Sequence, residues 1–316
     1  RGLGDVYKRQ VSKITLLKYI DNWNRFVAVP DPILGNYILK LLEQGEIVLG
    51  DIYVKVPITR LGYILKTITI KRRRGRKTIT VPTKSIGIDA HQFYELYTKV
   101  PKSPYPAFIG TEEKFRQSMR IKPNAYIAPK NEKVKEKATE IFDAYSGRIL
   151  VPGVNVRWNT SRVIVTYSDQ ELLSNTHYAI KLDVQEHLRE YAEKSLVLWF
   201  NTTWGLLSIL INREETEGAW AQIKMGQWML MPVLDVVSLD LDTLKRLAKV
   251  FDRYADKTLR RIPQQFNPVS PDPVRFNIDV EFLKALSPGI DENIVKEELR
   301  KLYKRIHVAI QLWTGS

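Results

Sequence analysis

The first third of the chain changes from a helical to an alternating pattern of apolar and polar residues. Residues 33–44 have helical periodicity, and from residue 47 to 81 the period changes to two, with β-branched residues throughout. The clearest unit runs from Thr67 to Val81, where isoleucine, valine and threonine alternate on both sides of a short polar segment. This pattern predicts a β-hairpin in which each arm buries one face.

Residues 83–130 are expected to form irregular connections with short elements packed on the sheet, and helical periodicity recurs from residue 132 onward. Asp240 is expected to cap one helix, and Gly147 to end another. Strands are expected at residues 148–151 and 162–167, with an aromatic, strand-like segment up to residue 233 after Gly218. The helices are expected at residues 132–145, 186–211, 240–254, 274–286 and 291–312.

These elements predict an α+β protein. A β-rich region over residues 11–184, with a protruding hairpin, is expected to pack on a mostly helical region over residues 185–316. Residues 1–10, RGLGDVYKRQ, resemble translated sequencing adaptor and begin with Arg1 rather than Met. They are therefore excluded from the fold, and the natural protein is expected to extend upstream of Val11.

Composition narrows the classes of partner. Lysine and arginine number 49 against 35 aspartate and glutamate residues, and the resulting formal charge of +14 attracts polyanions. The absence of cysteine excludes disulfides and thiolate zinc sites, and suits the cytoplasm, where we expect the protein. The most apolar stretch, residues 196–211, is interrupted by Asn201, Thr202 and Thr203, so no membrane partner is expected.

The expected hairpin turn, KRRRGRK at residues 71–77, has six cations in seven residues. Such crowding is repulsive unless a polyanion offsets it, and a two-stranded ribbon fits the major groove of DNA. Arginine can pair with guanine there and lysine can bind phosphate, while Gly75 suits a tight turn. The alternative is a solvated loop tip. The candidate DNA-binding residues are Lys71, Arg72, Arg73, Arg74, Arg76 and Lys77.

A second group of candidates lies in the string RWNTSRV, where Arg157, Asn159 and Arg162 surround an expected strand entry. The alternative for these residues is ordinary turn chemistry.

Catalytic motifs are missing. The chain has no HExxH, GxSxG or GxxxxGKS string and no glycine-rich cofactor loop, so neither a catalytic nor a metal site is assigned. His177 and His187 lack a surrounding motif and are interpreted as structural. A metal-dependent nuclease with carboxylates from distant positions, such as Glu140, Asp183 and Asp235, remains an alternative.

Several strings give a resemblance to a known family. From about residue 105 to 286 the chain resembles the C-terminal region of adenine-specific DNA methyltransferases of restriction-modification systems. The most specific string is residues 196–236, with NTT, REET, GAW and MPV in order. The others are YPAFIG (105–110), RQSM (116–119), RILVP (148–152), NTSRVIVTY (159–167), LLSNTHYAI (172–180) and DPVRFNID (272–279).

This resemblance implies a role in DNA target recognition for an N6-adenine methyltransferase. The family's catalytic Asn/Asp/Ser-Pro-Pro-aromatic motif is missing, and Asn267-Pro268-Val269 and Asp272-Pro273-Val274 only approach it. This chain by itself is thus not expected to be catalytic. S-adenosylmethionine is expected in a missing upstream methyltransferase domain, which would be a partner together with double-stranded DNA. A subunit-contact module that uses the Trp-rich segment 196–236 is the alternative.

Overall fold

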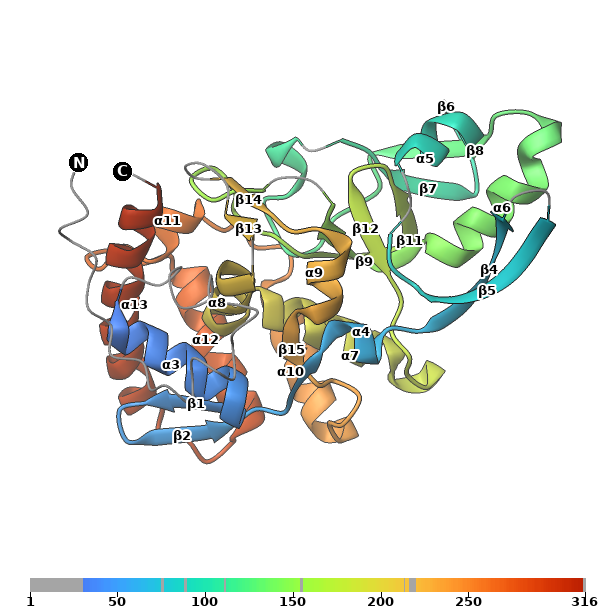
Figure 1. Ribbon diagram of the computed structural model, residues 1–316. Coiled ribbons are helices and arrows are strands. Elements are labelled where there is room, and N and C mark those ends of the chain that lie inside the picture. The colour runs from blue at the N-terminus through green and yellow to red at the C-terminus, as the bar shows by residue number, and fades with distance from the viewer. Residues whose placement is uncertain are drawn as a thin grey trace.

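The computed structural model describes residues 31–74, 77–87, 90–110, 112–153, 156–212, 214–215 and 220–314. The expectations for residues 1–10, and for Gly75 and Arg76, lie outside this part of the chain. The protein is a mixed α and β structure with a six-stranded sheet and a helical C-terminal region (Figure 1), which confirms the predicted fold class.

The N-terminal elements pack on the helical region. Helix α3 (Pro32–Gln44) starts at Asp31, whose carboxylate accepts hydrogen bonds from the backbone N–H groups of Ile33 and Leu34. It ends at Gly45, whose φ of 63° favours glycine. Strands β1 (Glu46–Leu49) and β2 (Ile52–Lys55) then form a separate two-stranded sheet.

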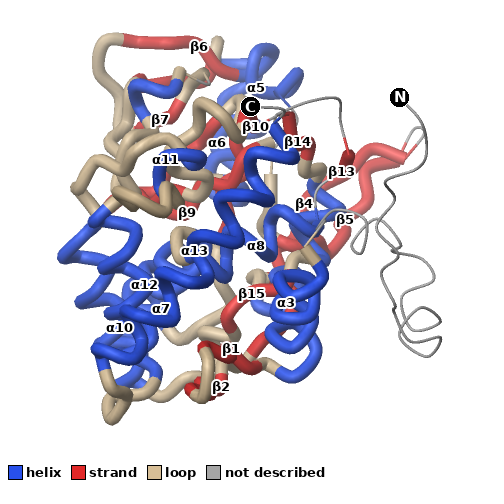
Figure 2. Tube along the Cα trace, turned by 90° about the vertical axis from the view of Figure 1, so that its left-hand side faces the viewer, coloured by secondary structure: helices blue, strands red, loops and turns tan. Residues whose placement is uncertain are grey.

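The hairpin follows a short connection of β3 (Ile58–Arg60) and α4 (Leu61–Ile64). Its strands β4 (Thr67–Arg74) and β5 (Lys77–Lys84) pair antiparallel over their full length and form a two-stranded sheet of their own. Figures 1 and 2 show this hairpin extending away from the helical region toward one side of the molecule.

The six-stranded sheet has the order β12-β9-β11-β7-β8-β6, and β7 and β11 pair parallel while its other neighbouring strands are antiparallel. Helices α5 (Ala90–Leu96) and α6 (Lys135–Tyr145) contribute to an apolar cluster that includes Phe93, Ala138 and Leu173. The strands are β6 (Tyr97–Val100), β7 (Tyr105–Phe108), β8 (Ala125–Pro129), β9 (Gly147–Pro152), β11 (Thr166–Ser174) and β12 (His177–Ile180). Two 3-10 turns, η3 (Glu113–Phe115) and η4 (Glu132–Val134), lie in the connections.

The expected role of Gly147 as a helix end is wrong. Helix α6 ends at Tyr145 with Ser146 as its cap, and Gly147 is the first residue of β9, with a φ that is not positive. A Cβ atom at this position would lie 2.5 Å from the carbonyl oxygen of Ile180 on β12. Glycine is required because two backbones approach closely, not because a helix stops.

The helix expected over residues 186–211 is two helices, α7 (Glu186–Phe200) and α8 (Thr203–Asn212), which meet at 70°. The Asn201 side chain donates hydrogen bonds to the carbonyl oxygens of Val165 and Val197, and Thr202 donates to the carbonyl oxygen of Trp199. The bond to Val165 ties the bend to another segment of the chain, while the bonds to Val197 and Trp199 satisfy carbonyl groups at the end of α7, and so these polar side chains stabilise the bend.

The strand expected up to residue 233 also contains a helix. Strands β14 (Trp220–Gln222) and β15 (Pro232–Leu234) flank helix α9 (Met225–Leu230). Trp228 on α9 is fully buried and donates its indole N–H to the carbonyl oxygen of Pro152. The short helix α9 is enough to bury this ring. Over so few residues, the apolar pattern does not distinguish a helix from a strand.

The C-terminal helices are α10 (Leu241–Tyr254), α11 (Ile262–Gln265), α12 (Pro273–Leu286) and α13 (Glu292–Thr314). Asp240 accepts a hydrogen bond from the Thr243 N–H, as its predicted capping role requires. Small strands β10 (Val156–Arg157), β14 and β13 (Glu214–Glu215) form a further three-stranded sheet, and β15 pairs with β3. The main apolar core contains Leu34 from the N-terminal region and Leu299 from the C-terminal region. The division of the chain into two regions at residue 184 stays a prediction.

Candidate functional site

The β4–β5 hairpin places most of the candidate cations on one two-stranded ribbon. The register pairs Arg72 with Ile79, Arg73 with Thr78 and Arg74 with Lys77. At its base, Ile68 and Ile70 are half-buried, whereas the alternating threonines Thr67 and Thr69 are exposed. The backbone therefore follows the alternation that the sequence predicts, and the arginine-rich segment continues the same two paired strands from this base toward the turn.

Lys71, on the hairpin strand β4, forms an ion pair with helix α6. Its Nζ lies 2.6 Å from Oε1 of Glu140 on α6, and both side chains remain about half exposed. The hydrogen bond and the charge of Glu140 raise the pKa of Lys71 above its usual value. Lys71 therefore joins the base of the hairpin to α6, a contact between residues that are far apart in the sequence.

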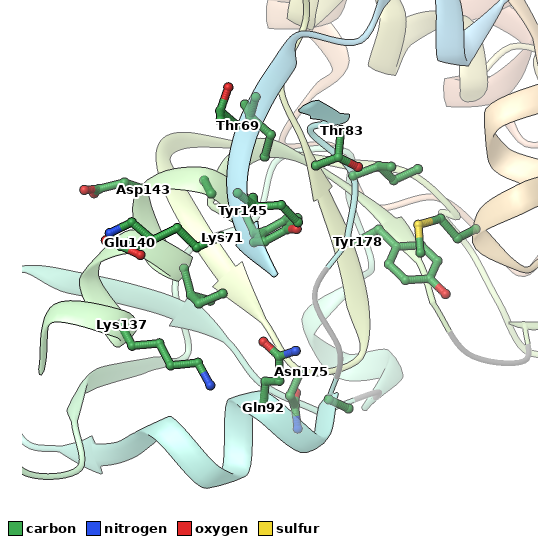
Figure 3. Close-up of a pocket in the computed structure, with 18 of the residues that line it drawn as sticks. Thr69, Lys71, Thr83, Gln92, Lys137, Glu140, Asp143, Tyr145, Asn175 and Tyr178 are labelled. Carbon is green, nitrogen blue, oxygen red and sulfur yellow. Dashed lines mark hydrogen bonds and ion pairs between the residues drawn. The ribbon is translucent and has the colours of Figure 1, made fainter. Parts of the chain in front are cut away.

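A cleft of about 1500 Å³ lies between the hairpin, α6 and the start of β12. Figure 3 shows Thr69 and Lys71 of β4, Lys137 and Glu140 of α6, and Tyr178 of β12 around it. Among the described residues, its charged lining consists of three lysines and three acids: Lys71, Lys133, Lys137, Glu136, Glu140 and Asp143. The cleft is thus balanced in charge, and the excess of cations begins beyond it, in residues 72–77 of the hairpin.

His177 also borders the cleft, but its ring is part of the interior. Only 2% of the residue is exposed, and its Nδ1 lies 2.9 Å from Oγ1 of Thr176. The Phe108 ring packs edge-to-face against the imidazole, with 5.4 Å between the ring centroids. Burial, followed by the nearby charge of Arg116, lowers the pKa of His177 to about 3. A neutral, packed imidazole fits the structural role expected from the sequence.

This burial predicts a loss of stability in mild acid. Because the pKa of His177 is about 3 in the folded state and 6.5 in the unfolded state, its contribution is complete above pH 6.5 and is lost as the pH falls toward 3. Between pH 7 and pH 5 the loss from this group is about 2 kcal/mol. Urea unfolding at both pH values should show this loss for the natural chain and a smaller one for His177→Gln; equal losses would exclude His177 as the cause.

The second group of candidates lies on a turn that packs against a loop from the helical region. Arg162 donates through Nη1 to the carbonyl oxygen of Leu259 at 2.7 Å, and the Ile262 N–H donates to the carbonyl oxygen of Ser161 at 2.9 Å. Arg162 thus holds the two segments together. Arg157 and Asn159 are exposed on the turn, so the structure separates an anchoring residue from two that face solvent.

The acidic residues and the histidine that were candidates for catalysis do not form one site. Glu140 pairs with Lys71, and among the described residues no group of three or more His, Cys, Asp or Glu is arranged to hold a metal. Glu140, Asp183 and Asp235 therefore do not form the metal-binding group that a nuclease would need. His187 is exposed at the start of α7.

The two proline strings have local structural roles. Asn267 accepts hydrogen bonds from the N–H groups of Val269 and Ser270 in a turn. Asp272 caps α12, with Pro273 at the first helical position. Neither string forms a site for a base.

Among the described residues, no single helix has the length and composition to cross a membrane, although α7 and α8 meet that test together as a pair bent by 70°.

The loop that bears Arg260 and Arg261, which contacts the turn of Arg157 and Asn159, was not predicted as a site from the sequence. Arg260 and Arg261 are exposed there, and their adjacency in RRIPQQ was the available signal. Only the fold brings them to the segment that carries Arg157 and Asn159.

The chain was compared with known proteins. No family model matches it, and no curated protein gives a significant match. Among solved structures, the type IIG restriction endonuclease BpuSI has a similar fold, with a TM-score of 0.52 at 11% sequence identity. The similarity covers 92% of this chain and 33% of the endonuclease chain, so this chain spans about a third of that protein's length. At this identity the comparison shows a shared fold.

Proposed function

We propose that this chain recognises a DNA target for a restriction-modification system, as the recognition region of an N6-adenine DNA methyltransferase. The observation that carries this proposal is the β4–β5 ribbon, which forms its own two-stranded sheet and bears arginine at three successive positions, Arg72 to Arg74. A ribbon of two strands has the width of the major groove, and its cations can bind both bases and phosphates. Methyl transfer, with S-adenosylmethionine, belongs to a domain outside this sequence.

The structural comparison supports this proposal. The similar structure is a restriction endonuclease, and almost all of this chain aligns with a third of it. That proportion fits one functional region of a larger enzyme. The strings that resemble adenine-specific methyltransferases supply the more specific part of the proposal.

Partner contact through the buried tryptophans of segment 196–236 is disfavoured, although Met225 and Leu230 of the same segment are exposed. Trp199, Trp204 and Trp228 are all fully buried, and they contact other aromatic rings of the same chain. Their side chains are therefore part of the core and do not reach a partner.

The direct test titrates the 316-residue chain with duplex DNA of random sequence at several salt concentrations. Binding that weakens steeply with salt supports the proposal, because each neutralised phosphate contributes about 0.9 to the slope of log affinity against log salt. A folded protein that does not bind even at low salt would contradict it. Single-stranded DNA and RNA competitors show whether the duplex is preferred.

The ion pair between Lys71 and Glu140 makes a further prediction. In the natural chain, a DNA phosphate must displace the Glu140 carboxylate before it can bind Lys71. Glu140→Gln removes this negative charge, so the phosphate no longer competes with an ion pair. Affinity at low salt should increase, and the salt slope should become steeper by up to about one. Glu136→Gln is the matched control, since Glu136 lines the same cleft and has only a weaker, charge-based effect on Lys71. If both variants bind alike, Glu140 does not hold Lys71 back from DNA.

A further inference from the structure

The loop between α10 and α12 contains a shallow pocket whose side chains present hydrogen-bond donors. Its volume is about 370 Å³, and it is lined by Arg260, Gln264, Asn267 and Ser270. None of these residues belongs to the hairpin or its cleft. Figure 1 shows α11, which carries Gln264, far from the hairpin along the length of the molecule.

The hydrogen bonds of the two amides determine which group faces outward. Asn267 Oδ1 accepts from the backbone N–H groups of Val269 and Ser270 at 2.9 and 3.0 Å, and Gln264 Oε1 accepts from the N–H of Arg261 at 3.3 Å. A backbone N–H can only donate, so each amide oxygen must face the backbone. The NH₂ groups of both side chains are then the polar atoms left for a ligand.

Arg260 adds positive charge in a held position. Its Nη1 donates to the carbonyl oxygen of Ser270 at 3.0 Å, which leaves the donors on Nε and Nη2 for a ligand. Beneath it, the buried carboxylate of Asp272 accepts from the N–H groups of Arg260, Val274 and Arg275. Its oxygens are thus occupied by backbone donors and do not pair with the Arg260 guanidinium.

The surface next to the pocket is also basic. Arg261 is exposed beside Arg260, and the turn that bears Arg157 and Asn159 is bonded to this loop through Ser161. Gln265 Nε2 adds a bond of 2.8 Å to the carbonyl oxygen of Arg162. The expected DNA contacts of the turn therefore continue into the loop.

We propose that Arg260, Gln264, Asn267 and Ser270 form a phosphate-binding subsite for the DNA backbone, separate from the hairpin. This inference rests on the proposed function for the source of the phosphate. A cation and two amide NH₂ groups around one depression match a phosphate group, which offers only acceptor oxygens. The subsite contributes affinity and orientation, while sequence is read elsewhere.

The test exchanges donors for acceptors without removing the turn. The double variant Gln264→Glu/Asn267→Asp keeps each oxygen that faces the backbone and replaces each outward NH₂ group by a carboxylate oxygen. Its control is Gln311→Glu/Asn277→Asp, which makes the same two chemical changes at exposed positions on α13 and α12. Both are titrated with random duplex DNA over a salt series, after circular dichroism and urea unfolding show natural folding.

We expect the subsite variant to bind DNA more weakly, with a salt slope smaller by about one for each phosphate that it no longer binds, and the control to resemble the natural chain. Equal binding by the two variants would overturn the subsite and leave the proposed function standing. A natural chain that binds no DNA would overturn the proposed function. In that case, thermal stabilisation by inorganic phosphate that the subsite variant lacks would support the pocket as a site for free phosphate, and no stabilisation would overturn both.

Discussion

Replacing Arg72, Arg73, Arg74 and Arg76 by glutamine should remove most DNA binding and reduce the salt slope by about 3 to 4 units. The expected size follows from four phosphates that are no longer neutralised, at about 0.9 for each. Fluorescence anisotropy with a labelled duplex at several salt concentrations measures both quantities. The fold should not change, because the half-buried residues Ile68 and Ile70 at the base of the hairpin and the pairing of β4 with β5 are retained in this variant.

Total charge must be separated from local contact in this experiment. A control that changes Lys40, Lys245, Lys249 and Lys304 to glutamine removes the same charge from exposed positions on α3, α10 and α13. If DNA contacts the hairpin, the control retains most of the slope. Similar decreases in both variants would mean that the overall charge of +14, and not the hairpin, attracts DNA.

Asp279→Ala should produce the largest change in stability, a decrease in the free energy of unfolding of about 3–5 kcal/mol. Asp279 is fully buried on α12 and accepts hydrogen bonds from the Thr203 N–H at 2.8 Å and from the Tyr303 hydroxyl at 2.6 Å. Burial raises its pKa, and the charge of the equally buried Arg275 acts in the opposite direction. Alanine would leave Arg275 without that opposite charge and the donors of Thr203 and Tyr303 without an acceptor.

Urea denaturation at neutral pH measures this change. Asp279→Asn should lose less stability, because an amide oxygen can still accept from Thr203. Asn277→Ala, on the exposed side of the same helix, should change the free energy of unfolding by no more than about 0.5 kcal/mol. An alanine variant at 279 as stable as the one at 277 would show that this buried network does not hold α8 and α12 together.

The two proposed contacts with DNA have different physical characters. The hairpin concentrates charge on a ribbon that can enter a groove, whereas the pocket at Arg260 has its donors fixed by hydrogen bonds within one loop. The first suits reading a sequence and the second suits holding a backbone. A recognition region needs both, because base contacts are useful only when the duplex is correctly positioned.

The sequence by itself determined the features that depend on neighbouring residues. The hairpin was predictable because alternation and a glycine-containing turn are local properties, and its paired strands confirm the arms. The helix start at Asp240 was predictable for the same reason, since a cap bonds to an N–H three residues away.

Only the tertiary structure decided the features that depend on distant partners. The bend after Phe200 is held by Asn201, which bonds to Val165, and by Asp279, which accepts from Thr203 across 76 residues. Lys71 meets Glu140, 69 residues away, and the loop of Arg260 reaches the surface of Arg157 through the hydrogen bond of Arg162. Periodicity reports which face of an element is buried, but it carries no information about which other element supplies the partner. Such hydrogen bonds and ion pairs exist only after the chain has folded.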